Sequence, residues 1–240
     1  KDLFNRDSVN LFPPFLKDID DSFFAKYLKS SDNNFIKPKI YLGLMAPNYS
    51  STQTFQVRVY SRLLYSVFTL DPSERDPWFT LMNFFGSLRE LGNTISLISI
   101  DIPDRLKLLT KRYNIDFNDT RRGLNLNTLE LTSREENDKI AESIDKLKVS
   151  SNDKDNKPVD LCLASNIIEV GVDIPRLSLL TILGQPKTTS SYIQVSGRIG
   201  RNFQERPGLV LTLYGHMRPR DKSHFEKFQS YHEKLYAQVE

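Results

Sequence analysis

Apolar residues along the chain follow two kinds of spacing, and each kind predicts a different element. Short apolar runs of about four to eight residues are typical of buried strands, whereas apolar residues three or four positions apart are typical of amphipathic helices. The runs predict strands at residues 40–45, 78–85, 129–132, 159–164, 177–183 and 209–214. The helical spacing predicts helices over 53–70, from residue 87 onward, and over 134–148, 189–198 and 222–238, while 95–102 fits either a strand or the end of the preceding helix.

Predicted strands and helices alternate over most of the chain, which predicts the fold class. Such alternation is typical of α/β domains in which helices cover both faces of a mostly parallel sheet. Ligands of these sheets bind at the carboxyl ends of the strands. We therefore expect candidate functional residues in the loops that follow the strands.

The first 48 residues differ from the rest and predict an N-terminal extension or linker, with one domain over residues 49–240. Adjacent prolines at 13–14 and clusters of Asp, Asn and Ser interrupt regular structure there. The chain begins at Lys1 and not at a methionine. We therefore expect it to be a fragment of a longer protein.

Composition excludes several classes of protein. The 240 residues are 39% hydrophobic, which suits one globular α/β domain with additions. The lone Cys162 excludes a disulfide scaffold and a four-cysteine zinc site, and it is consistent with a reducing, cytoplasmic location. His216, His224 and His232 lie eight residues apart, so they do not share a helix face, and we expect no metal site. No apolar run is long enough to cross a membrane.

Charge adds information only through its distribution. The formal net charge is +3, which by itself does not indicate a nucleic-acid partner. Residues 185–240, however, carry nine Lys or Arg against five Asp or Glu. The basic excess therefore lies in the last quarter of the chain.

The sequence 194–201, Q-V-S-G-R-I-G-R, is the strongest indication of chemistry. Arg198 and Arg201 are three residues apart, so in a helical turn they share one face. Gly197 and Gly200 let the backbone pass close to a ligand. Two guanidinium groups on one face suit a polyphosphate, because each can contact two oxygens. A solvated basic turn near a helix end is the alternative.

A second polar segment precedes this one and also follows a predicted strand. Gly171 allows a tight backbone path, and Asp173 offers a carboxylate for a ribose hydroxyl or for orienting an arginine. Asp173 could equally be a turn carboxylate that caps local amides. Thr188 or Thr189 can cap the helix that presents Gln194 and the two arginines.

These spacings resemble the C-terminal RecA-like domain of superfamily 2 helicases. Residues 164–173 resemble motif V through Ser165, Gly171 and Asp173, and residues 194–201 resemble motif VI. Residues 79–89 are similar to motif IV. The element G-Q-P-K-T-T at 184–189 is similar to the helicases of DISARM-type antiphage defence systems. The resemblance implies a RecA-like three-layer α/β sandwich and a motor driven by ATP and Mg²⁺.

The resemblance also implies roles for individual residues. Arg201 would be the arginine finger, Arg198 its partner on the γ-phosphate, and Gln194 would orient water or phosphate. Gly171, Asp173 and Gly197 would line the ATP site. The DNA or RNA strand would contact a set of polar residues at the strand ends: Asn83, Ser87, Thr132, Ser133, Asn166 and Lys187. For Thr132 and Ser133, an N-cap role is an equal alternative, and both roles are compatible.

The phosphate-loop pattern and an acidic magnesium box are absent from the sequence. The resemblance places both in a preceding N-terminal RecA-like domain, which would be a partner in the same protein; other defence-system proteins are further candidate partners. We therefore expect the chain alone to hydrolyse almost no ATP. The alternative function is a non-catalytic nucleic-acid-binding or docking module with a helicase-like fold.

Overall fold

The computed structural model describes residues 38–49, 51–114, 125–132, 137–165 and 174–235. Within these residues, six parallel strands form one sheet in the order β1-β6-β5-β2-β4-β3. The strands are β1 (Lys39–Met45), β2 (Leu81–Phe85), β3 (Thr128–Leu131), β4 (Leu161–Ala164), β5 (Leu179–Leu183) and β6 (Gly208–Tyr214). The predicted α/β class with a parallel sheet is confirmed.

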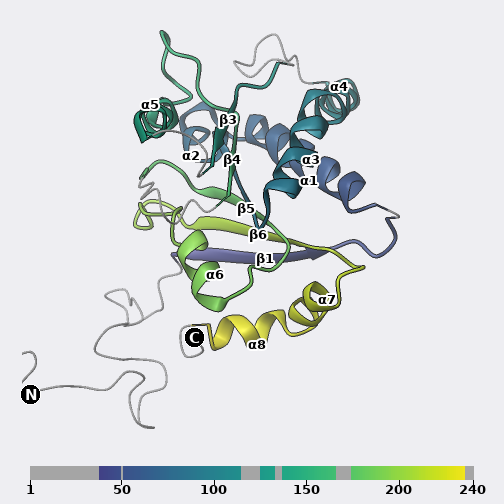
Figure 1. The fold of residues 1–240 in the computed structure, drawn as a ribbon. Helices are drawn as coiled ribbons and strands as arrows, with labels where there is room; N and C mark the ends of the chain where they lie inside the picture. The colour runs from purple at the N-terminus through teal and green to yellow at the C-terminus, as the bar shows by residue number, and fades with distance from the viewer. Residues whose placement is uncertain (1–37, 50, 115–124, 133–136, 166–173, 236–240) are drawn as a thin grey trace, which may run out of the picture.

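Helices cover both faces of the sheet, as Figure 1 shows. On one face lie α1 (Thr52–Ser66), α3 (Leu88–Ser99) and α4 (Asp101–Tyr113); on the other lie α5 (Asn137–Lys148), α6 (Thr189–Ser196), α7 (Pro219–Glu226) and α8 (Phe228–Glu233). Short helical turns η1 (Val67–Thr69), η2 (Pro72–Glu74) and α2 (Asp76–Phe79) connect α1 to β2.

Alternate residues of each strand face opposite sides of the sheet, and each side has its own hydrophobic core beneath the helices that cover it. In β2, Leu81 and Phe85 pack with α1, α3 and α4, whereas Met82 and Phe84 pack with the helices of the opposite face. All five side chains of β2 are buried. A central parallel strand that is buried on both faces reads as a continuous apolar run, which is why the sequence indicated this strand.

Several predicted boundaries differ from the structure for local reasons. The run 78–85 begins with the helical turn α2, because Pro77 favours the first turn of a helix. Residues 95–102 form the end of α3 and the start of α4, which meet at Ile100, and Ile102, Leu106 and Leu109 of α4 are buried at helical spacing. The predicted closing helix 222–238 is two helices that meet at Lys227, whose ψ of 21° leaves the helical region.

The boundary predicted at residue 48 falls after a strand that belongs to the sheet. Strand β1 pairs in parallel with β6 along its whole length, from Lys39 beside Gly208 to Met45 beside Tyr214. Helix α8 packs on this strand, since a Cβ on Gly43 would lie 2.7 Å from the ring of Phe228. Residues 39–45 are therefore part of the folded domain and not of an extension.

Asn83, which the sequence analysis expected at a ligand, lies in the core. Its side chain is 1% exposed, and its amide donates to the carbonyls of Leu81 and Cys162 at 2.9 and 3.2 Å. Its Oδ1 accepts from the Thr181 hydroxyl at 2.6 Å, and the same hydroxyl lies 3.3 Å from the Tyr60 hydroxyl. The structure places Asn83 in the core and not at a ligand-facing surface, because the strand buries the amide and the core uses its polar atoms. Asn83 joins β2, β5 and α1.

We expect Thr181→Val to destabilise the domain by about 1–3 kcal/mol, because it leaves the buried Asn83 oxygen without its donor. Urea unfolding of the chain measures this, with the exposed Thr128→Val on β3 as a matched control. Equal stability of the two variants would contradict the structural role of the Asn83 network.

Candidate functional site

Helix α6 positions the first of the candidate phosphate-contacting residues. Thr188 caps it, with its hydroxyl accepting from the Ser191 amide at 3.1 Å, as predicted. Tyr192 and Val195 are buried in the core, so the remaining face of the helix carries the exposed Gln194. Burial of one helix face thus presents Gln194 to solvent.

The helix ends at Gly197, and a tight turn follows. Gly197 itself is right-handed, but a Cβ there would lie 3.0 Å from the carbonyl oxygen of Ile193. Gly200 has a φ of +65°, and a Cβ there would lie 2.7 Å from the Cα of Gly208. The Gly200 amide also donates to the Leu177 carbonyl at 2.9 Å. This position requires glycine for both its conformation and its space.

The turn at Gly200 sets where the two candidate arginines lie. Arg198 is half-buried and Arg201 is exposed. Gly208, against which Gly200 packs, is the first residue of β6, and its amide donates to the Pro38 carbonyl at 2.9 Å. Arg201 therefore leaves the turn at the amino ends of β1 and β6. The sequence predicted functional residues at the opposite edge, where the strands have their carboxyl ends.

Lys39 is a cation at this edge that the sequence analysis did not identify. It begins β1 and lies in register with Gly208. Burial, and after it the positive charge of Arg201, lower the pKa of Lys39 to about 8. A lysine that is desolvated beside another cation would be stabilised by a bound anion. Lys39 was not considered because it lies within residues 1–48, which were predicted to be an extension, although a strand was predicted at residues 40–45.

The other candidate residues follow the carboxyl ends of four neighbouring strands. In sheet order, Lys187 follows β5, Ser87 follows β2, Ser165 follows β4 and Thr132 follows β3. Lys187 and Ser87 are exposed, whereas Thr132 and Ser165 are buried. The sheet order thus brings these polar residues into one row at the carboxyl edge.

Two serines in this row make different contacts. The Ser87 hydroxyl caps α3 by accepting from the Glu90 amide at 3.3 Å. The Ser165 amide donates to the Leu131 carbonyl at 3.2 Å, while its buried hydroxyl has no hydrogen-bond partner among the described residues. A cap residue at a helix N-terminus and a buried hydroxyl at a strand end are both suited to an anionic ligand.

Four predicted residues lie outside the described residues. They are Ser133, Asn166, Gly171 and Asp173. The chain is described again from Ile174, directly after the segment that resembles motif V. Their predicted roles at the ATP and strand sites stay predictions.

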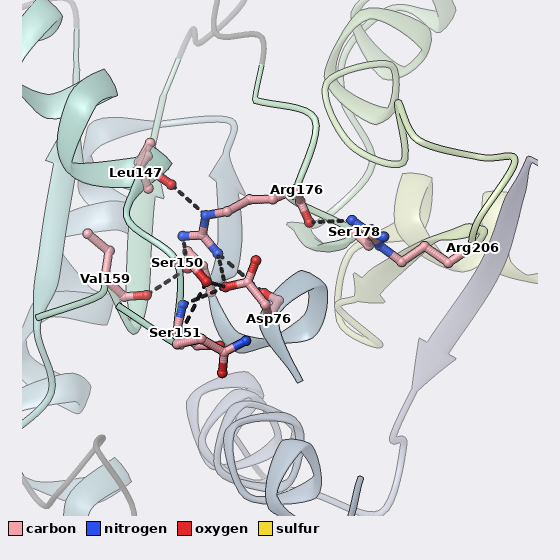
Figure 2. A network of polar contacts seen from close by, with 10 residues as sticks. Asp76, Leu147, Ser150, Ser151, Val159, Arg176, Ser178 and Arg206 are labelled. Atoms are coloured by element: carbon pink, nitrogen blue, oxygen red, sulfur yellow. Dashed lines mark hydrogen bonds and ion pairs between the residues drawn. The ribbon is translucent and has the colours of Figure 1, made fainter. Parts of the chain in front are cut away.

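Arg176, in the segment after residue 173, was also missed by the sequence analysis. Its guanidinium donates to the carbonyls of Leu147 and Asp76 at 2.8 and 3.2 Å and to the Thr80 hydroxyl at 2.9 Å, as drawn in Figure 2. The Asp76 carboxylate lies 3.6 Å away. Burial lowers the pKa of Arg176 and the charge of Asp76 opposes this shift. An arginine directly after a proline gave no recognisable signal in the sequence.

The described residues contain no cluster of three His, Cys, Asp or Glu side chains that could hold a metal ion. Within the same residues, no helix is long and apolar enough to cross a membrane. The donor set at the amino edge is instead cationic: Lys39, Arg198 and Arg201, with the Gln194 amide on the helix before them. Such a set fits the phosphates of a nucleotide.

Comparisons with known proteins show what the chain is similar to. Residues 100–203 match the family model of the helicase conserved C-terminal domain. The DISARM protein DrmA of Bacillus paralicheniformis is 37% identical over 243 residues, covering 99% of this chain and 20% of DrmA. The chain thus spans about a fifth of the length of this curated relative.

Two solved helicase structures share the fold at low sequence identity. The DUF1998 helicase MrfA bound to DNA superposes with a TM-score of 0.54 at 15% identity, over 83% of this chain and 23% of that chain. The helicase Lhr of Mycobacterium smegmatis, bound to ssDNA and AMP-PNP, gives 0.50 at 15% identity, over 84% of this chain and 22% of that chain. Residues 100–203 therefore match the helicase conserved C-terminal domain, and the chain over nearly its whole length is similar in sequence to the DISARM protein DrmA.

Proposed function

We propose that this domain is the arginine-bearing half of an ATP-dependent helicase or translocase. A longer protein would supply a second RecA-like domain, with the phosphate loop and the carboxylates that hold Mg²⁺. The observation that carries the proposal is the glycine turn at Gly200, which fixes Arg201 beside Lys39 at one edge of the sheet. We also propose a function in antiphage defence, which the sequence similarity to the DISARM protein DrmA supports.

In this proposal the amino edge of β1 and β6 contacts the nucleotide. Arg201 lies against the γ-phosphate and stabilises the charge that develops when the phosphoryl group is transferred. Arg198 contacts the same phosphate from the preceding turn, and Gln194 orients the attacking water. Asp173, in the segment before Arg176, contacts the ribose or orients an arginine. Lys39 adds a positive charge, and a bound anion stabilises the protonated form of this lysine.

The carboxyl edge of the sheet contacts the nucleic acid. Lys187, Ser87, Ser165 and Thr132 form the row described above, and Ser133 and Asn166 adjoin it in sequence. Hydroxyls and a lysine contact phosphates without reading the bases. ATP closes the cleft between the two domains and hydrolysis opens it, so the grip of this row on the strand alternates and the protein moves along the backbone.

The alternative is a docking module that binds nucleic acid without catalysis. Such a module would have no need for a left-handed glycine before an exposed arginine, or for a desolvated lysine beside it. Desolvation of a lysine beside another cation costs stability, and perturbed charges of this kind are typical of functional sites. These features favour the motor.

We expect Arg201→Ala in the longer protein to lower ATP turnover by about 10³–10⁵-fold, because an arginine finger contributes that much to phosphoryl transfer. Nucleic-acid affinity should be unchanged. Steady-state ATPase assays test this, with the exposed Arg112→Ala on α4 as a control for loss of a surface arginine. Turnover that matches the control would contradict the arginine-finger assignment and favour the docking module.

We expect Lys187→Ala to weaken nucleic-acid binding and to reduce the slope of log affinity against log salt by about 1, as loss of one phosphate contact predicts. Fluorescence anisotropy with a single-stranded oligonucleotide at several salt concentrations measures the slope. The matched control is the exposed Lys111→Ala on α4, which should leave the slope unchanged. An unaltered slope in the Lys187 variant would place the strand elsewhere.

Lys39 predicts a specific dependence of stability on pH. Its pKa is about 8 in the folded chain against an ordinary 10.5, so between these values the unfolded chain binds more protons. Stability of the wild type relative to Lys39→Met should therefore rise as pH rises from 8 to 10.5, by up to roughly 3 kcal/mol. Urea unfolding across this range tests it, and a flat difference between the wild type and Lys39→Met would show that Lys39 is not desolvated.

A further inference from the structure

Two segments of the site are joined through the backbone at the amino edge of the sheet. One is residues 174–178, which leads from the motif V-like sequence into β5; the other is residues 200–209, which leads from motif VI into β6. Leu177 accepts from the Gly200 amide at 2.9 Å, and Ser178 accepts from the Leu209 amide at 2.7 Å. The turn that carries Arg201 is therefore anchored at both ends to the same short segment.

Arg176 fixes this segment to the body of the domain. The guanidinium contacts described above reach α2, the residue before β2, and the end of α5, and the arginine side chain is only 11% exposed. The Ser178 amide adds a bond to the Pro77 carbonyl at 2.9 Å. Residues 176–178 thus form a rigid support for whatever is anchored to them.

Arg206 reaches from the far side of the arginine turn to this support. Figure 2 shows its side chain extending toward Ser178 and Arg176. Its Nε donates to the Ser178 hydroxyl at 3.2 Å, and its Nη2 lies 3.5 Å from the Arg176 carbonyl. Glu205 pairs with the same guanidinium at 2.7 Å. The side chain is 20% exposed, so these contacts are partly shielded from water.

Within the turn between Arg201 and Arg206, the Glu205 and Arg206 amides donate to the Asn202 carbonyl, both at 3.2 Å. The strand that follows is held independently by its pairing with β1 and β5. Loss of the Arg206 side chain would therefore loosen the turn while the sheet stays paired.

We propose that Arg206 is a positioning residue for Arg201, which it serves by clamping the turn of residues 201–206 to the Arg176–Ser178 support. The inference rests on the proposed function, since positioning matters only if Arg201 contacts phosphate. Gly200 fixes the near end of the turn and Arg206 fixes the far end. A pre-organised arginine costs no reorganisation in the transition state, and a displacement of about 1 Å can lower the rate by about 10²-fold.

The test is steady-state ATPase kinetics of the longer protein with saturating nucleic acid. Arg206→Ala should lower kcat by about 10–100-fold, while the KM for ATP and the affinity for nucleic acid stay within about threefold of the wild type. Arg75→Ala is the matched control, because Arg75 is also half-buried and its guanidinium also bonds to the backbone, donating to the carbonyls of Leu70 and Phe68 away from the site. The control should keep its kcat.

Two further variants separate positioning from folding. Ser178→Ala removes the same hydrogen bond from the other side, so it should lower kcat in the same direction and its effect should not add to that of Arg206→Ala. Arg206→Lys retains one donor and should recover part of kcat. If Arg206→Ala does not fold, these two carry the test, since a loss of kcat at an unchanged melting temperature supports positioning.

Arg201→Ala, measured in parallel, distinguishes failure of the proposed function from failure of the positioning role of Arg206. If its turnover equals that of the wild type, the proposed function fails. If Arg201→Ala is inactive but Arg206→Ala and Ser178→Ala keep the kcat of the Arg75 control, the motor assignment stands and the positioning role of Arg206 is overturned.

Discussion

At the amino end of the sheet two glycine backbones pass each other so closely that a Cβ on Gly200 would lie 2.7 Å from the Cα of Gly208. This contact, with the bonds from Gly200 to Leu177 and from Gly208 to Pro38, joins the starts of β5, β6 and β1. Arg201 follows the contact directly, and Lys39 lies beside it. A side chain at either glycine would separate the strands or displace the arginine, so the geometry of the site depends on the absence of two Cβ atoms.

Helix α6 connects this edge to the opposite one. It begins just after Lys187, at the carboxyl end of β5, and ends just before Arg198 at the amino edge. Eight helical residues span about 12 Å, which separates the row of polar residues proposed for nucleic acid from the cations proposed for ATP. Burial of Tyr192 and Val195 ties the helix to the sheet. A rigid helix between two edges is suited to transmit a change at one ligand to the other.

The sequence predicted the helices and strands, which leave a periodic pattern of apolar residues, but not the residue contacts that depend on the tertiary structure. The alternation of apolar runs and amphipathic segments indicated the α/β class and every strand of the described sheet, because buried strands and half-buried helices leave periodic patterns. Asn83 was assigned to a ligand because its neighbours resemble motif IV; only the packing of β2 against Thr181 and Tyr60 shows that it is a core residue.

The same distinction holds for the candidate site. Arg198, Arg201 and the Thr188 cap were identified because their spacing is local to one helix and one turn. Lys39, Arg176 and Arg206 were missed because their roles depend on residues far away in sequence, such as Arg201, Leu147 and Ser178. A buried cation acquires its function from its surroundings, which a single sequence does not display.

The central claim is that Arg201 contacts the phosphate that is transferred. The most direct measurement is a structure of the longer protein with a nucleic-acid strand and ADP–aluminium fluoride, which mimics the phosphoryl group in transit. We predict that the Arg201 guanidinium lies about 3 Å from the fluoride ligands, as a charge-assisted hydrogen bond requires. A nucleotide bound with its aluminium fluoride enclosed by other residues, while Arg201 remains in solvent, would contradict the account.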